Sequence, residues 1–207
     1  MTVHILQNIL RASFILLIIV FICRWEGYAT SLTKLEYGQL TVEASAPETE
    51  KWPLHVKIVL PIKAETEAVW KVLTEYDQMK EFVPHMTKCR VIEQQGNTFN
   101  VEQVYKHLLI SMKLLLSIKH NHPNRIDFHL VGGNMKVYDG HWSIEPYNPG
   151  GTLLSLEVDV QPGFFAPRGI VSWILKKELP EGVMAVAEKA IKDSGKTPSP
   201  KKEEKIP

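Results

Sequence analysis

Few side chains in this sequence combine polar chemistry with a position on the apolar side of a predicted strand. In a predicted strand every second side chain lies on the same face, and this alternation places the following side chains on the inward face: Gln103, Tyr105, Tyr138 and Trp142. Phenol, amide and indole groups can orient a ligand by hydrogen bonds, but they are a weak set for acid–base catalysis. The simpler interpretation of both tyrosines is that they are core aromatic residues with a hydroxyl at the rim. The sequence therefore predicts no catalytic residue.

The carboxylates of the same strands fall on the outward faces, and these are Asp127, Asp139, Glu157 and Asp159. An enzyme site needs polar groups that converge in a pocket. The chain also shows no Ser-His-Asp order, no Gly-rich phosphate loop and no paired cysteine site. We keep an enzyme, a cyclase or hydrolase acting on a lipid-like substrate, as the alternative hypothesis.

Eight histidines justify a search for metal ligands. His120 and His122 can project to one side of a strand, whereas His129 and His141 lie on outward faces. Zinc sites take three or four ligands, and no third ligand has a reason to converge with these residues. We therefore expect surface or turn histidines, no metal site and no cofactor.

Length and composition predict a single globular domain with a core large enough to fold alone. The chain has 207 residues, 44% of them hydrophobic, and a formal net charge of +1. A near-neutral balance gives no reason to expect nucleic acid as a partner. Cys89 is the one cysteine after residue 29, so that part of the chain cannot form an internal disulfide. We interpret Cys89 as a small buried hydrophobic residue.

The N-terminus has the pattern of an export signal. Arg11 precedes an apolar run over residues 12–23, and small residues stand at Gly27 and Ala29. The run is shorter than the roughly 20 residues of a spanning helix. We predict that residues 1–29 are a signal peptide cleaved after Ala29, which makes the protein periplasmic or secreted. The alternative is an uncleaved membrane anchor.

The rest of the chain alternates between two periods. Residues 30–51 are expected to be a loose lead-in with one early strand near 39–44, and residues 196–207 a disordered tail. Helical spacing is predicted over 64–76 and 78–83. Strands with one apolar face are predicted over 52–62, 90–95, 99–109, 111–120, 125–131, 136–145 and 152–161.

A long amphipathic helix over 169–194 is predicted to end the domain. Its apolar stripe includes Val171, Leu175 and Val183, while Pro180 predicts a kink or a break into two helices. A helix and a sheet with one apolar face each bury the other. Gly140 lies in a strand, where glycine marks a bend that a curved sheet needs. The expected class is α+β, an antiparallel sheet of about six or seven strands curved around the last helix.

Three stretches together carry a resemblance to a known family: AETEAVWKVLTEYDQMKEFVPHMTKCRVIE at 64–93, GHWSIEP at 140–146 and GTLLSLEVDVQPGFFAPRGIV at 151–171. The chain resembles the START-like, helix-grip (SRPBCC) superfamily in its polyketide cyclase/dehydrase and lipid transport branch, and is similar to coenzyme Q-binding proteins. The resemblance implies a START-like domain over 52–195 with a cavity between sheet and helix. Members mostly bind hydrophobic small molecules such as lipids or quinones, and a minority are enzymes. The export signal departs from the cytoplasmic and mitochondrial members.

We expect the ligand to contact inward side chains, with Tyr105 as a hydrogen-bonding group and the following residues as apolar wall: Phe128, Tyr138, Trp142, Leu156, Phe164 and Trp173. Phe164 and Phe165 stand in a Pro/Gly turn before the last helix, where they either control access and touch a membrane transiently or close the core. A third hypothesis is a ligand-free interaction module whose core is filled by its own side chains.

Overall fold

The structure, a computed structural model, describes residues 31–37, 40–46, 52–107, 110–147 and 150–195. The predicted signal or anchor at 1–29 and the predicted tail at 196–207 lie outside the described residues.

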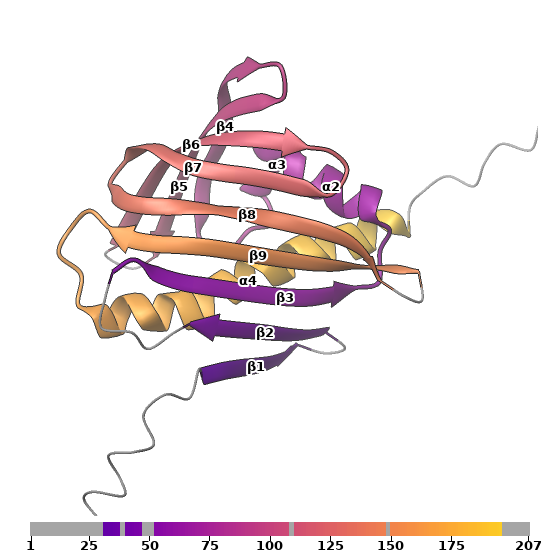
Figure 1. Ribbon diagram of the computed structural model, residues 1–207, viewed down its shortest axis with the longest axis horizontal. Coiled ribbons are helices and arrows are strands. Elements are labelled where there is room, and N and C mark those ends of the chain that lie inside the picture. The colour runs from indigo at the N-terminus through magenta and orange to yellow at the C-terminus, as the bar shows by residue number, and fades with distance from the viewer. Residues whose placement is uncertain (1–30, 38–39, 47–51, 108–109, 148–149, 196–207) are drawn as a thin grey trace, which may run out of the picture. The chain divides into compact units, whose positions relative to one another are not determined.

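The described chain forms one antiparallel sheet that is closed on one side by a long helix (Figure 1). In chain order its strands are β1 (Ser31–Tyr37), β2 (Leu40–Ala46), β3 (Leu54–Ile62), β4 (Met86–Gln95), β5 (Thr98–His107), β6 (Ile110–Asn121), β7 (Arg125–Gly133), β8 (Met135–Tyr147) and β9 (Gly151–Pro162). Across the sheet the order is β1-β2-β3-β9-β8-β7-β6-β5-β4. The last strand therefore pairs with β3, and the meander β4 to β9 carries the sheet to its other edge.

The predicted early strand near residues 39–44 is confirmed by β2, whereas the rest of the loose lead-in prediction for residues 30–51 missed β1. Two strands, β1 and β2, occupy most of this segment, and β2 pairs with β3 through Glu43 opposite Val59. An unpaired β3 edge would expose a row of backbone N–H and C=O groups. Backbone pairing satisfies these groups with little regard to side-chain polarity, so the alternation rule did not detect both strands.

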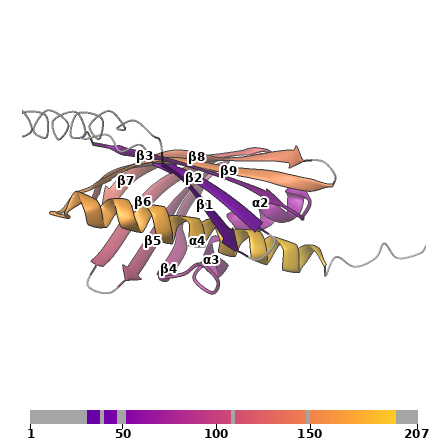
Figure 2. The ribbon, with the colours of Figure 1, turned by 90° about the horizontal axis from the view of Figure 1, so that it is seen from below.

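Three helices accompany the sheet in the described ranges: α2 (Thr66–Thr74), α3 (Tyr76–Met79) and α4 (Arg168–Ser194). Helix α4 runs across one face of the sheet (Figure 2). It continues through Pro180, so the two-helix alternative was wrong, because a proline removes one hydrogen bond while the rest of the ladder persists. No helix in the described residues combines the length and apolar character needed to cross a membrane.

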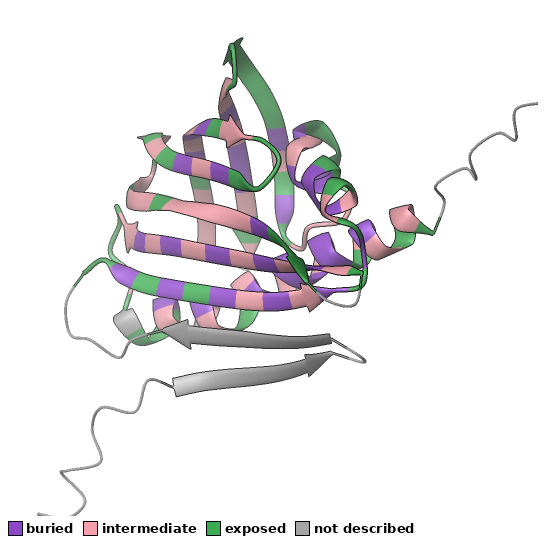
Figure 3. Ribbon diagram, turned by 45° about the vertical axis from the view of Figure 1, so that its right-hand side comes forward, coloured by how far each residue is buried: buried purple, intermediate pink, exposed green. Residues whose placement is uncertain are grey.

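The core lies between the inward face of the sheet and α4. Every second side chain of β3 is buried, as are five alternate residues of β9, which gives the striped pattern in Figure 3. Helix α4 contributes Val171, Leu175, Val183, Val186 and Ala187. The predicted helix-grip fold, with a curved antiparallel sheet and a long C-terminal helix, is confirmed.

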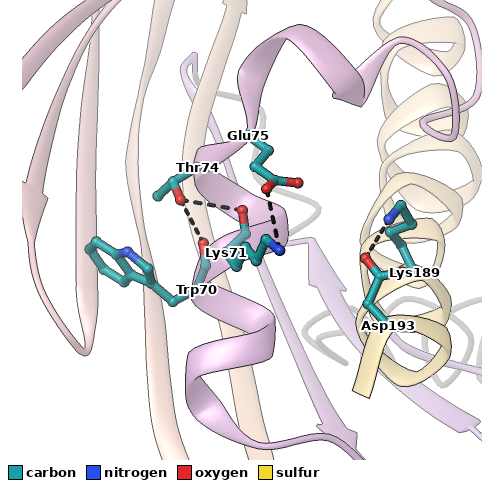
Figure 4. A network of polar contacts seen from close by, with 6 residues as sticks. All are labelled: Trp70, Lys71, Thr74, Glu75, Lys189 and Asp193. Carbon is teal, nitrogen blue, oxygen red and sulfur yellow. Dashed lines mark hydrogen bonds and ion pairs between the residues drawn. The ribbon is translucent and has the colours of Figure 1, made fainter. Parts of the chain in front are cut away.

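Helix α2 packs beside α4 and covers one end of the sheet. The Thr74 hydroxyl donates to the carbonyl oxygens of Trp70 at 3.0 Å and Lys71 at 3.3 Å, within the last turn of α2 (Figure 4). Lys71 pairs with Glu75, and on α4 Lys189 pairs with Asp193. Such i,i+4 pairs contribute about 0.3–0.5 kcal/mol. Burial of the apolar face of α2 is therefore the larger contribution to its position.

Gly140 lies in the middle of β8, opposite Phe128 on one side and Val158 on the other. A Cβ atom on Gly140 would lie 2.1 Å from the Glu157 carbonyl oxygen and 2.8 Å from the Val158 Cα atom. These atoms belong to backbone that is held in the sheet, so they cannot move aside. Glycine is thus required at this position, where the backbone of β9 leaves no room for a Cβ atom.

We expect Gly140→Ala to destabilise the fold by about 1–3 kcal/mol, because the strand has to move away from β9. Gly182 in α4 is the matched control, since the nearest atom to a Cβ there is a flexible Val83 methyl group at 3.9 Å. Gly182→Ala should stabilise the protein by about 0.5–1 kcal/mol. Chemical denaturation of both variants measures the difference, and equal stabilities would contradict the close approach.

Candidate functional site: an apolar cavity between sheet and helix

A cavity of about 220 Å³ lies between the inward face of the sheet and α4. Engineered cavities of about 150 Å³ are large enough to hold benzene, so this space is larger than a packing defect. Six strands, β4 to β9, and helices α2, α3 and α4 contribute to its wall. Helix α4 alone contributes Val171, Ile174, Leu175, Leu179, Val183 and Val186. The hypothesis of a core filled by its own side chains is not supported by a cavity of this size.

Six of the seven predicted ligand contacts lie on this wall: Tyr105, Phe128, Tyr138, Trp142, Leu156 and Phe164. They come from β5, β7, β8, β9 and the turn after β9. The rings of Phe128 and Tyr138 pack together with centroids 5.8 Å apart. The side chain of Trp173 lies outside the described part of the chain. The structure thus brings the six side chains together, and their contact with a ligand stays a prediction.

Two neutral phenols supply polar groups in the middle of the cavity wall. The Tyr105 hydroxyl donates a hydrogen bond to the Gln103 side-chain oxygen at 3.2 Å. Burial raises the pKa of Tyr105 well above its usual value and that of Tyr138 to about 12. A general acid or base that works near neutral pH needs a pKa shifted toward 7, which is the opposite direction. These tyrosines are suited to hydrogen bonding with a ligand.

Cys89 lies in the core, with 3% of its surface exposed. Burial raises the pKa of its thiol to about 12. The thiolate is the reactive form of cysteine, so this thiol is not a nucleophile near neutral pH. The interpretation of Cys89 as a small buried hydrophobe is confirmed.

The four strand carboxylates face away from the cavity, as predicted. Glu157 pairs with Lys57 at 2.5 Å, Asp159 with His55 at 2.9 Å and Asp127 with Arg125 at 2.7 Å. The Asp139 carboxylate accepts a hydrogen bond from the Leu130 backbone N–H. None of the four belongs to the cavity wall, so they cannot exchange protons with a ligand there.

A polar cluster at the edge of the cavity was missed by the sequence analysis. His85, His107 and Glu178 come from the turn before β4, the end of β5 and the middle of α4. The Glu178 carboxylate lies 3.0 Å from His85 Nε2 and 3.3 Å from His107 Nδ1, and the two ring nitrogens are 3.0 Å apart. The separations of these three residues along the sequence follow no metal-binding motif. The one feature of the sequence that could have indicated the cluster is that two histidines stand at the ends of adjacent strands.

A second histidine contact involves Tyr76, which belongs to the cavity wall. The Tyr76 hydroxyl donates to His120 Nε2 at 2.6 Å, and the Phe99 ring stacks on His120 with centroids 4.3 Å apart. Burial lowers the pKa of His120 and raises that of Tyr76. The neutral imidazole is therefore the form that accepts this hydrogen bond.

Exposed apolar side chains stand beside the cavity in the turn that leads to α4. Phe164 contributes to the wall and is 38% exposed, whereas Phe165 is 96% exposed. Ile170, in the first turn of α4, is also on the wall and half exposed. A continuous apolar path therefore leads from the cavity to the surface at this turn.

A curved antiparallel sheet that holds a C-terminal helix over a cavity defines the helix-grip class of proteins. The family model for polyketide cyclase / dehydrase and lipid transport matches residues 62–187 of this chain, so the chain belongs to that family. A comparison with curated proteins found no match.

Solved structures with the same fold have low sequence identity to this chain. The STAR-related lipid transfer protein fragment from Xanthomonas axonopodis has a TM-score of 0.65 at 12% identity, over 80% of this chain and 99% of that one. Human StAR-related lipid transfer protein 5 has a TM-score of 0.59 at 10% identity, over 88% and 97%. The Zhui aromatase/cyclase from Streptomyces sp. R1128 has a TM-score of 0.60 at 15% identity, over 67% and 93%. At these identities the likeness shows the fold.

The contact between Tyr76 and His120 predicts a pH-dependent loss of stability. A histidine in the unfolded chain binds a proton near pH 6.5, whereas folded His120 resists protonation. The contribution of neutral His120 to the stability of the fold is present above about pH 6.5. It is lost as the pH falls, because the unfolded state binds the proton first. His120→Gln should flatten the melting temperature between pH 7 and 5 relative to the unmodified chain. His129→Gln, at an exposed position, should leave the profile unchanged, and identical profiles for both variants would contradict the assignment.

Proposed function

We propose that this protein binds a hydrophobic small molecule, a lipid, a quinone or a similar compound, in the cavity between the sheet and α4. The observation that carries the proposal is a cavity of about 220 Å³ whose wall is mostly apolar and includes two neutral phenols. Removing apolar surface from water stabilises a complex by about 25 cal/mol per Å², so burial supplies the affinity. The phenols then orient the ligand through its polar group.

The family description supports the handling of lipid-like molecules, and the neighbours named above include both lipid transfer proteins and an aromatase/cyclase. A cyclase is therefore the alternative function. The tyrosine pKa values and the outward strand carboxylates favour binding without chemistry in the middle of the cavity. For the alternative, Tyr105→Phe or Tyr138→Phe should abolish turnover while the fold persists.

The proposed carrier works outside the cytoplasm, which the export pattern of residues 1–29 supports. An apolar molecule has a low free concentration in water, so a carrier in an aqueous compartment provides the soluble form. The intact mass of the protein from its native source tests this step, since a chain that begins at Met1 would contradict cleavage after Ala29.

The first test is to identify the molecule that accompanies the protein. Mass spectrometry of an organic extract from the natively purified protein should find one hydrophobic compound in stoichiometric amount. Leu156→Trp should eliminate this compound, because the larger ring occupies the cavity. Ser155→Trp, on the other face of the same strand, should retain it. Native mass spectrometry that shows an empty unmodified protein would contradict the proposal.

We further propose that the turn with Phe164 and Phe165 contacts the membrane while the ligand passes. A fully exposed phenylalanine beside the cavity can enter the lipid interface, where its burial is favourable. The ligand then moves from membrane to cavity along apolar side chains. This step depends on exposure of the turn and not on the volume of the cavity.

Phe165→Asp should slow transfer of the bound compound between vesicles several-fold, because the charge opposes insertion of the turn. The amount bound at equilibrium should stay unchanged, since Phe165 is not on the cavity wall. Ile92→Asp replaces an apolar side chain that is 50% exposed on β4 and should have no effect on transfer. Equal rates for the two variants would count against a role of the turn.

A further inference from the structure

We propose that His85, His107 and Glu178 bind one divalent transition-metal ion at the edge of the cavity, with a coordination position left open toward the ligand. The inference deepens the proposed function and rests on it for the identity of the bound molecule. It specifies a hydrophobic compound whose polar head carries an oxygen able to coordinate the metal.

The first argument is the spacing of the three donor atoms. His85 Nε2, His107 Nδ1 and one Glu178 oxygen form a triangle with sides of 3.0, 3.0 and 3.3 Å. Tetrahedral zinc with bonds of about 2.0–2.1 Å holds its ligand atoms about 3.3 Å apart. Small side-chain movements therefore suffice to place a metal ion at equal distance from all three atoms.

The second argument is that hydrogen bonds alone account poorly for this triangle. Each imidazole nitrogen carries at most one hydrogen, which points in one direction in the plane of the ring. If both N–H groups point at Glu178, the contact between His85 and His107 is left as two facing nitrogens. If one ring instead donates to the other, the accepting ring nitrogen has no hydrogen for its contact with Glu178. A metal ion uses the lone pairs of both rings and the carboxylate oxygen together.

The third argument concerns charge. The Glu178 side chain is 13% exposed, and its carboxylate faces the two imidazole rings. A carboxylate that is largely removed from water needs a positive charge beside it. A divalent cation supplies this charge while both histidines stay neutral, which is the form in which they coordinate metals.

The three ligands are held by rigid elements. His85 has a φ of 60°, which is uncommon for a residue other than glycine, and its carbonyl oxygen accepts a hydrogen bond from Lys106 N–H at 2.8 Å. His107 ends β5 beside this bond, and Glu178 stands within α4. The strained conformation of His85 turns its ring toward the helix, and such strain persists where the surrounding structure enforces it.

All three residues belong to the cavity wall, so the metal would border the space for the ligand. Three protein ligands leave one tetrahedral position open, as in zinc sites that bind water or a substrate. A carboxylate, phosphate, quinone or hydroxyl oxygen fits this position. The ligand would then lie with its polar head at the metal and its apolar body against the wall residues.

The test uses the full-length chain without a histidine tag, freed of metal by a chelator and of hydrophobic compounds by extraction. Calorimetric titration with Zn²⁺ should show one ion per chain. Titration with Co²⁺ should give the intense visible bands of tetrahedral coordination. His85→Ala, His107→Ala and Glu178→Gln should each weaken binding by at least about 100-fold, since loss of a mere supporting partner already costs about 10–100-fold.

His55→Ala is the matched control, because His55 also contacts a carboxylate, that of Asp159 at 2.9 Å, but on the outer face of the sheet. It should bind Zn²⁺ as the unmodified chain does. Glu178→Gln keeps the shape of the side chain, so it decides the test if a histidine variant fails to fold. Absence of stoichiometric binding, or equal affinity in the control and all three cluster variants, would overturn the site.

Azide, a small anion that binds metal ions, tests the open position. It should shift the Co²⁺ bands of the unmodified chain, and unchanged bands would overturn the open position. Both readouts use the metal without any hydrophobic compound. A protein that carries a lipid but no metal would therefore refute this inference alone, and one that binds metal but no hydrophobic compound would refute the proposed function alone.

Discussion

The structure depends on the packing of one helix against a sheet that is much wider than the helix. The seven strands from β3 to β4 across the sheet span about 30 Å at 4.8 Å per strand, whereas a helix with its side chains is about 10 Å wide. Helix α4 therefore cannot cover the inward face alone. Helices α2 and α3 cover one end, and curvature of the sheet brings more of its face toward α4. The space that remains between them is the cavity.

Curvature in turn depends on close approach of backbones. At Gly140 the strands β8 and β9 come so near that no side chain fits between them. Tyr138 and Trp142 stand two residues to either side of this glycine and point into the cavity. The close contact of Gly140 with β9 therefore fixes the part of β8 that carries these two wall residues. The sheet therefore sets much of the shape of the site, together with α4 and the turn that precedes it.

Alternation along single strands was enough to place the predicted strand residues on the cavity wall. Phe128 and Leu156 were assigned inward because a strand turns every second side chain to one face, and a sheet with one apolar face leaves no other arrangement. The long helix was predicted from the period of its apolar stripe. Strand alternation and the period of the helical stripe are both local patterns, and the folded structure follows both.

Other features depended on information that no local rule contains. Strand β2 forms through backbone pairing to the edge of β3, and β1 pairs with β2 in turn, which places few demands on their side chains. His85, His107 and Glu178 meet because β4, β5 and α4 converge, and their positions along the chain show no common period. The polar end of the site therefore became visible only in three dimensions.

The cavity lowers the stability of the folded protein. Unfilled apolar space destabilises a protein by about 24 cal/mol per Å³, which for 220 Å³ amounts to about 5 kcal/mol. This is a large share of the 5–15 kcal/mol that is typical of a domain's stability. A ligand that fills the cavity restores the lost contacts, so folding and ligand binding are linked. The empty protein is then the less stable form, because α4 alone leaves this part of the core open.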